Sequence, residues 1–183
     1  MKNELSSEQW AGERGNKWCS KLAGMEAMLA PLNAPLIDAL KLDKSYRIAE
    51  VGCGGGGTAV EIHSAAPEGS TVHGYDINSD LIEAARGRIS AGNESIAFEV
   101  ADMESTLPLA RPYDRLVSRF GTLFFSDEHA GFTNLAKWLA PGGRFAFAVW
   151  GPAAENPWIT TGREVVSSII DLPQPEPDSP GPF

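Results

Sequence analysis

Three acidic residues stand out because each lies at or just after the end of a short apolar run. They are Glu50, Asp76 and Asp102. If the runs are parallel strands, their carboxyl ends meet at one edge of a sheet, which is where open α/β sheets bind ligands. Carboxylates gathered at that edge accept hydrogen bonds from hydroxyls and amines, and they attract cations.

A glycine run at residues 52–57 directly follows the first apolar run. Gly52, Gly54 and Gly57 fit the GxGxxG pattern of dinucleotide-binding loops, and Asp76 lies 24 residues after Gly52, near the place of a ribose-binding acid. One hypothesis is therefore an NAD-dependent oxidoreductase. Glu50 argues against it, because a carboxylate beside the loop repels the pyrophosphate of a dinucleotide. S-adenosylmethionine fits the acids better, since it carries a ribose diol, an adenine amine, an ammonium and a sulfonium.

The elements that must position these residues alternate regularly. Apolar runs predict strands at 47–51, 71–77, 96–101, 113–119 and 144–150, and helical patterns follow at 58–66, 79–90, 127–140 and 158–170. Ser79 is the predicted N-cap of the helix at 79–90, and residues 140–143 are predicted to end the helix at 127–140 before the last strand. This alternation predicts βαβ units and a parallel sheet covered on both faces.

The two ends of the sequence differ from this middle part. Residues 5–42 show helical spacing of apolar side chains, with breaks expected at Pro31 and Pro35. Five prolines within the last eleven residues predict an extended segment. We therefore expect a helical N-terminal cap at 1–43, an α/β domain at 44–171 and a proline-rich tail or connector at 172–183.

The net charge, the apolar runs and the cysteines limit which partners, which location and which metals can be expected. The 183 residues carry a formal net charge of −9. Such a charge repels phosphate backbones, so no nucleic-acid partner is expected. The first twenty residues contain no signal-peptide core, and no apolar run reaches the ~18 residues that span a bilayer, which predicts a cytoplasmic protein without a membrane span. Cys19 and Cys53 show neither metal nor disulfide spacing, so no metal is expected.

Five stretches carry a more specific signal: AEVGCGGG at 49–56, GYDI at 74–77, EVADM at 99–103, SRFG at 118–121 and LAPGGRF at 139–145. In this order they resemble the class I S-adenosylmethionine-dependent methyltransferases, especially the ubiquinone/menaquinone-biosynthesis-like branch with a type 11/25 methyltransferase domain. The resemblance implies a Rossmann-like three-layer sandwich with a mostly parallel central sheet. It also makes 44–171 the domain that binds S-adenosylmethionine.

The same resemblance implies roles for individual residues at the methionine end of the cofactor. Glu50 would be oriented toward the amino group, and Ser118 and Arg119 would border the methionine end and the transferred methyl. The backbone of the glycine loop would lie against the methionine part, through Gly52, Cys53 and Gly54.

At the nucleoside end, the resemblance implies that Asp76 accepts hydrogen bonds from both ribose hydroxyls and that Ile77 packs on the adenine. Asp102 would bind the adenine amine, with Met103 covering the ring. S-adenosylhomocysteine would be the product. No catalytic residue is assigned, because a sulfonium methyl is already electrophilic and its transfer to an amine or an acidic oxygen or carbon needs no dedicated base.

The expected function is methyl transfer to a small-molecule acceptor by in-line displacement, with the NAD-dependent oxidoreductase as an alternative. The family usually adds a helix and an antiparallel strand pair after the fifth strand, whereas this sequence runs into prolines and ends at Phe183. The final strand pair is therefore expected to be absent. A truncated cofactor-binding module without turnover is a third hypothesis, and the open edge of the fifth strand favours a homo-oligomer.

Overall fold

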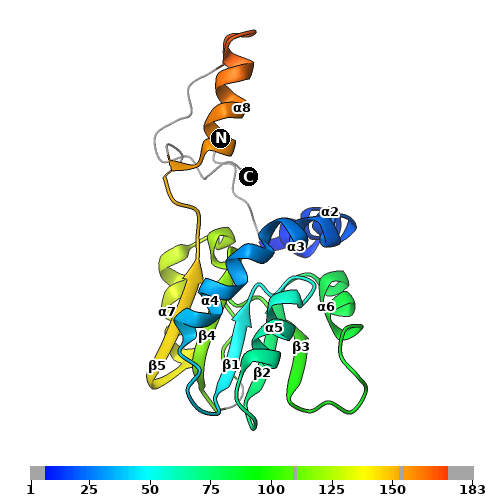
Figure 1. Ribbon diagram of the computed structural model, residues 1–183, viewed down its shortest axis with the longest axis vertical. Coiled ribbons are helices and arrows are strands. Elements are labelled where there is room, and N and C mark those ends of the chain that lie inside the picture. Colours follow the sequence, from blue (N-terminus) through cyan, green and yellow to red (C-terminus); the bar gives the residue numbers. More distant parts are fainter. Residues whose placement is uncertain (1–6, 109–110, 153–154, 173–183) are drawn as a thin grey trace. The chain divides into compact units, whose positions relative to one another are not determined.

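The computed structural model of the chain describes residues 7–108, 111–152 and 155–172. The chain falls into two compact units. The larger unit lies within Leu5–Ala148 and contains both the sheet and the helices that precede it in the sequence (Figure 1). The described residues of the smaller unit begin at Val149. The proline-rich residues 173–183 lie outside the described part of the chain.

The centre of the larger unit is a five-stranded parallel sheet in the order β3-β2-β1-β4-β5. Continuous pairing of β1, β2 and β3 sets their register, with Glu50 opposite Gly74 and Gly74 opposite Phe98. Because the strands are parallel, their carboxyl ends meet at one edge, as the strand–helix alternation predicted. The strands are β1 (Arg47–Val51), β2 (Thr71–Asp76), β3 (Ile96–Val100), β4 (Tyr113–Arg119) and β5 (Leu139–Ala148).

Two local predictions were wrong. β5 begins at Leu139, because Tyr113 already pairs with Leu139 and Arg115 then pairs with Arg144, so residues 140–143 form an irregularity within the ladder rather than a loop before it. The N-cap of α6 (Ser79–Arg86) is Asn78, not Ser79. Asn78 has the extended backbone of a cap, and its side chain accepts a hydrogen bond from the Leu81 N–H at 3.0 Å.

Helices cover both faces of the sheet. On one face, α4 (Asn33–Leu40), α5 (Gly57–Ala65) and α6 pack apolar side chains against the strands, and Leu40, Ile62 and Ile82 are fully buried there. On the other face, α7 (Glu128–Trp138) stacks Trp138 on Tyr113 with ring centroids 6.0 Å apart. The architecture is thus the predicted Rossmann-like three-layer sandwich. Within the described residues β5 pairs with β4 alone.

The predicted N-terminal helical segment is present, but its breaks differ from those expected. Pro31 lies inside a 3-10 turn, and Pro35 lies in the first turn of α4, where a missing N–H costs no helical hydrogen bond. The elements before α4 are α1 (Ser7–Ala11), α2 (Glu13–Ser20), α3 (Leu22–Leu29) and η1 (Ala30–Leu32).

Helix α4 is fixed at its C-terminal end by a buried arginine of β4. The Arg115 guanidinium donates to the carbonyl oxygens of Leu40 at 2.6 Å and Lys41 at 3.4 Å, which have no partner within the helix. This anchor holds α4 across the sheet, with its first residue, Asn33, near the carboxyl end of β4.

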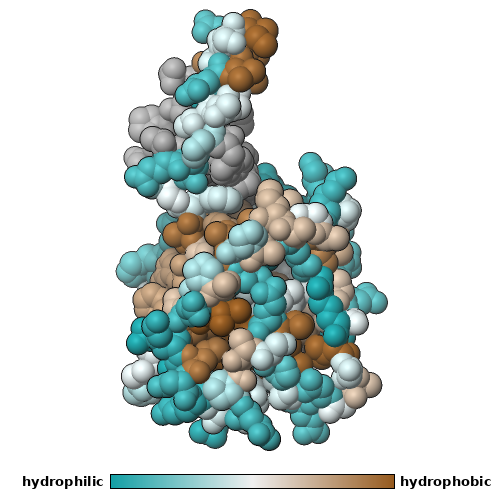
Figure 2. Space-filling view, viewed as in Figure 1, coloured by the Kyte–Doolittle hydropathy of each residue, from teal (hydrophilic) through white to brown (hydrophobic). Residues whose placement is uncertain are grey.

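The smaller unit contains α8 (Pro157–Ser167). Its segment exposes several aliphatic side chains, and Figure 2 shows brown apolar surface there. The exposed side chains are Val165, Val166, Ile169 and Ile170. None of the helices in the described ranges is long and apolar enough to cross a membrane.

Candidate functional site

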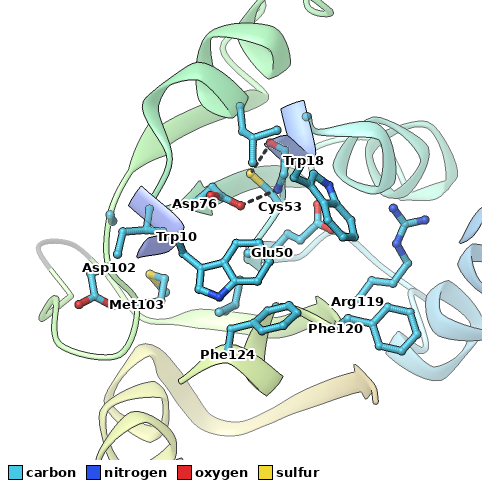
Figure 3. A pocket seen from close by; sticks show the side chains of 18 of the residues that line it. Trp10, Trp18, Glu50, Cys53, Asp76, Asp102, Met103, Arg119, Phe120 and Phe124 are labelled. Atoms are coloured by element: carbon cyan, nitrogen blue, oxygen red, sulfur yellow. Dashed lines mark hydrogen bonds between the residues drawn. The ribbon is translucent and has the colours of Figure 1, made fainter. Parts of the chain in front are cut away.

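A pocket opens at the carboxyl ends of the central strands (Figure 3). It is lined by the glycine loop after β1, the ends of β2 and β4, the loop after β3, the N-terminal helices and the 3-10 turn η2 (Gly121–Phe124). Of the ten site residues predicted from the sequence, all but Ser118 line this pocket. Four chain segments that are separated in the sequence, at residues 50–54, 76–77, 102–103 and 119, therefore supply one site.

Ser118 is not among the residues that line the pocket, and its predicted place at the methionine end stays a prediction. The side chain is fully buried, and its hydroxyl donates to the Val51 carbonyl at 2.7 Å. The same oxygen accepts a hydrogen bond from the Thr122 N–H at 3.3 Å. Ser118 therefore ties the end of β4 to the end of β1 and to the start of η2.

The glycine loop and the loop after β4 touch through two glycines. Gly52 has a φ of 67°, and a Cβ placed there would lie 2.7 Å from the Gly121 Cα. A Cβ on Gly121 would lie 2.6 Å from the Val51 carbonyl oxygen. Neither position has room for a side chain, so bare backbone forms this part of the pocket and a ligand can approach it closely.

Asp76 is oriented by two backbone donors. Its carboxylate accepts hydrogen bonds from the Gly54 N–H at 2.8 Å and the Asn78 N–H at 2.9 Å, one on each oxygen. A carboxylate oxygen has a second lone pair, so both oxygens can still accept a ligand hydroxyl. Burial raises the pKa of Asp76, and the backbone donors oppose that rise. This geometry suits a vicinal diol, and Ile77 lines the pocket next to it.

Glu50 is a buried carboxyl that still needs a donor. It is 1% exposed, and its Oε2 has no hydrogen-bond partner in the described part of the chain. Burial raises its pKa from the ordinary 4.5 to about 8, with Arg119 lowering the pKa and Asp76 raising it. A ligand cation with N–H groups would provide both the missing hydrogen bond and the missing charge.

The loop after β3 forms the margin of the pocket that Figure 3 labels with Asp102 and Met103. Asp102 accepts hydrogen bonds from the Glu104 N–H at 3.0 Å and the Ser105 hydroxyl at 2.9 Å. Met103 is 3% exposed and packs with the core under α7, where Asn134 donates to its carbonyl at 3.1 Å. The loop is therefore held rigidly, with an apolar side chain and an acceptor facing the pocket.

The side chain of Cys53 packs inside the glycine loop, and its buried thiol is not positioned to act as a nucleophile. Its thiol is buried 3.6 Å from the Gly54 carbonyl oxygen, and burial raises its pKa. Its backbone N–H donates to the Tyr75 carbonyl at 2.9 Å and so joins the loop to β2. The thiol stays protonated and contributes to packing within the loop.

An aromatic wall from the N-terminal helices was not among the predicted site residues. Trp10 packs on Phe124 with centroids 4.2 Å apart and edge-on to Trp18 at 6.4 Å. Asn78 holds this wall against the sheet by donating to the carbonyl of Ala11 at 3.0 Å. The contacts of Trp10 with Phe124 and of Asn78 with Ala11 join residues more than sixty positions apart, and no local pattern in the sequence marks them.

The pocket is strongly acidic. Among the described residues that line it, Arg119 is the single basic side chain. Such a lining attracts a cationic ligand and repels a diphosphate. The acidic lining residues are Glu26, Glu50, Asp76, Asp102 and Glu104.

Comparison with known proteins agrees with this chemistry. The model of a family described as "Methyltransferase domain" matches residues 48–143. Phosphoethanolamine N-methyltransferase 1 of Triticum aestivum is 32% identical over 59% of this chain and 21% of its own length. Aklanonic acid methyltransferase DauC of a Streptomyces species is 29% identical over 64% of this chain and 54% of its own length. The chain thus spans about a fifth to a half of these relatives.

Solved structures share the fold. A putative methyltransferase solved in complex with the Trm112 methyltransferase activator of Haloferax volcanii superposes with a TM-score of 0.70 at 19% identity. The match covers 82% of this chain and 66% of that one. The narrower placement in the ubiquinone/menaquinone branch stays a prediction, and the NAD-dependent alternative gains no support from these matches. The chain belongs to the class I S-adenosylmethionine-dependent methyltransferases, whose cofactor is S-adenosylmethionine.

Proposed function

We propose that the chain binds S-adenosylmethionine in this pocket and that its methyl group passes to a small-molecule acceptor. The observation that carries the proposal is the buried Glu50 oxygen without a partner, beside an Asp76 carboxylate that backbone donors have already oriented. An ammonium satisfies the first group and a ribose diol satisfies the second. Bare glycine backbone lies between them.

Each predicted residue that lines the pocket has a proposed place in this arrangement. Glu50 and the loop backbone at Gly52, Cys53 and Gly54 would hold the methionine part, and Arg119 would border it. Asp76 would hold the ribose. Ile77 and Met103 would enclose the adenine, and Asp102 would accept its amine. Bound S-adenosylmethionine would supply a methyl group that is electrophilic because it is attached to a sulfonium. The sulfur would be the leaving group and would become a neutral thioether.

The acceptor is proposed to be a small molecule. Trp10 and Phe124 bring packed aromatic rings to the pocket lining, as is common in small-molecule sites. A net charge of −9 disfavours a nucleic acid. The relatives named above act on phosphoethanolamine and aklanonic acid, which are both small molecules.

The residues that face the ligand space also suit an acceptor that needs no strong base. The described lining contains no histidine, and the Cys53 thiol stays protonated because burial raises its pKa. The chain would therefore act by orientation and charge, excluding water with its aromatic side chains and stabilising the bound cation with its acids.

Calorimetric titration with S-adenosylhomocysteine, with NAD as the control ligand, tests the proposal. We expect micromolar binding of the first and none of the second. Labelled methyl groups should then pass to a member of an amine, phenol and carbon-acid acceptor panel. Binding of NAD alone would support the oxidoreductase alternative, and cofactor binding with no transfer would support a binding module.

A further inference from the structure

A neutral side chain anchors the single basic residue among the described pocket lining. Arg119 donates from Nη1 to the Oδ1 of Asn33 at 2.8 Å. Asn33 is the first residue of α4 and is only 3% exposed. A guanidinium has five N–H donors, so one hydrogen bond to an amide leaves further donors and the full positive charge for a ligand.

The orientation of the Asn33 amide is fixed by its two charged partners. Its Nδ2 donates to the Glu61 carboxylate on α5 at 2.8 Å, while its Oδ1 accepts from Arg119. A carboxylate can only accept and a guanidinium can only donate, so the amide cannot be reversed without losing both bonds. The Thr58 hydroxyl lies 3.4 Å from the same Oδ1. The chain of contacts therefore runs from α5 through α4 to the end of β4.

Arg119 and Glu50 place a guanidinium and an ionisable carboxyl at the same end of the pocket. Both side chains line it, Figure 3 shows them near one another, and the positive charge of Arg119 lowers the pKa of Glu50. The two form no ion pair, although both lie in the described part of the chain. A guanidinium and a carboxyl that are close but unpaired match a ligand that carries a carboxylate and an ammonium on one carbon, because the ammonium favours the ionised form of Glu50.

We propose that Asn33 is a positioning residue that aims Arg119 at the ligand carboxylate, so that Arg119 and Glu50 together select the amino-acid zwitterion of the cofactor. This inference rests on the proposed function. An aspartate in place of Asn33 would hold Arg119 equally well but would neutralise it, and it would face the Glu61 carboxylate. The neutral amide fixes the guanidinium without consuming its charge.

Two ligands that differ only in the presence of the amino-acid group can distinguish this positioning role of Asn33 from a merely structural role. S-adenosylhomocysteine carries the zwitterion, and 5′-methylthioadenosine shares its nucleoside and thioether but lacks the amino acid. In calorimetric titrations, Asn33→Leu should weaken binding of the first roughly tenfold, the scale of one lost charge-assisted hydrogen bond, and leave the second within about twofold. Asn33→Asp should show the same selectivity. Equal losses for both ligands, or no loss for either, would overturn the proposal.

Glu61, the exposed carboxylate that accepts a hydrogen bond from Asn33, can be replaced with less risk to folding. Glu61→Ala removes a negative charge that repels a ligand carboxylate. If this electrostatic repulsion were the only effect, the variant would bind the carboxylate more tightly. Loss of the Asn33 anchor predicts the opposite, a roughly threefold weaker binding of S-adenosylhomocysteine with no change for 5′-methylthioadenosine. Glu83→Ala is the matched control, since Glu83 is exposed on α6 outside the pocket, and its binding should stay unchanged.

The outcomes also distinguish this inference from the function on which it rests. A wild-type chain that binds neither ligand overturns both proposals. A wild-type chain that binds S-adenosylhomocysteine, with Glu61→Ala binding it as tightly or more tightly, overturns the role of Asn33 alone.

Discussion

Replacing Glu50 by glutamine separates the stability of the fold from the chemistry of the pocket. The folded chain keeps Glu50 protonated up to about pH 8, whereas the unfolded chain loses that proton near pH 4.5. Between these values the folded state binds more protons, so the free energy of unfolding falls as the pH rises, by ~1.4 kcal/mol per pH unit. From pH 4.5 to pH 7 the loss amounts to about 3 kcal/mol.

Glutamine has the shape of the protonated acid and does not ionise. We therefore expect Glu50→Gln to match the wild type in urea denaturation at pH 4 and to exceed it by up to about 3 kcal/mol at pH 7. Burial also raises the pKa of Asp76, but that contribution is present in both proteins and cancels in the difference. Glu83→Gln, on the exposed face of α6, should follow the wild type at both pH values.

The same variant should bind the ligand less well. An ammonium pairs with ionised Glu50, so the affinity of the wild type for S-adenosylhomocysteine should rise about tenfold per pH unit from pH 6 and level off near pH 8. Glu50→Gln should show no such rise and should bind about 2 kcal/mol more weakly at pH 8. A variant that gains no stability at pH 7, or a wild-type affinity that is flat from pH 6 to 8, would refute the reasoning.

Three further changes test the geometry around the pocket. Asp76→Ala should weaken S-adenosylhomocysteine binding by ~1–3 kcal/mol in calorimetry, because it orphans the ligand diol, and an unchanged affinity would remove the ribose role. Gly121→Ala should lower the Tm, since its Cβ would lie 2.6 Å from the Val51 carbonyl oxygen, and an unchanged Tm would contradict that contact. Asn78→Leu should speed proteolytic cleavage within residues 7–20, because the bond to Ala11 and the α6 cap are lost, while equal cleavage rates would show that other contacts hold α1 and α2.

Much of the fold follows from patterns that are local in the sequence. The apolar runs predicted β1 and β4 to the residue, and parallel pairing then brought Glu50, Asp76 and Asp102 to one pocket. The start of β5 could not be predicted in this way. Its first residue, Leu139, pairs with Tyr113 across an irregularity at 140–143, and the Pro-Gly-Gly sequence there is typical of a loop.

The missed parts of the site depend on contacts between distant residues. Asn33 meets Arg119 across 86 positions, and Asn78 meets Ala11 across 67. A single asparagine has no periodicity to reveal its partner, and each of these positions would fit a helix start or a turn equally well. Ser118 shows the reverse case, because the family resemblance implied a place at the pocket, whereas its hydroxyl donates to the Val51 carbonyl.

The charges of the pocket connect ligand binding to the direction of the proposed reaction. An acidic lining with one arginine attracts the sulfonium of S-adenosylmethionine, and that charge disappears once the methyl has moved. The zwitterion, the diol and the adenine are the same before and after transfer, so their contacts cannot distinguish substrate from product. The summed charge of the acidic lining can, because the loss of one positive charge from the ligand leaves these acids less well compensated. The energy that favours substrate over product would therefore come from the field of the acidic lining at the sulfonium, and not from the contact of Glu50 with the ammonium.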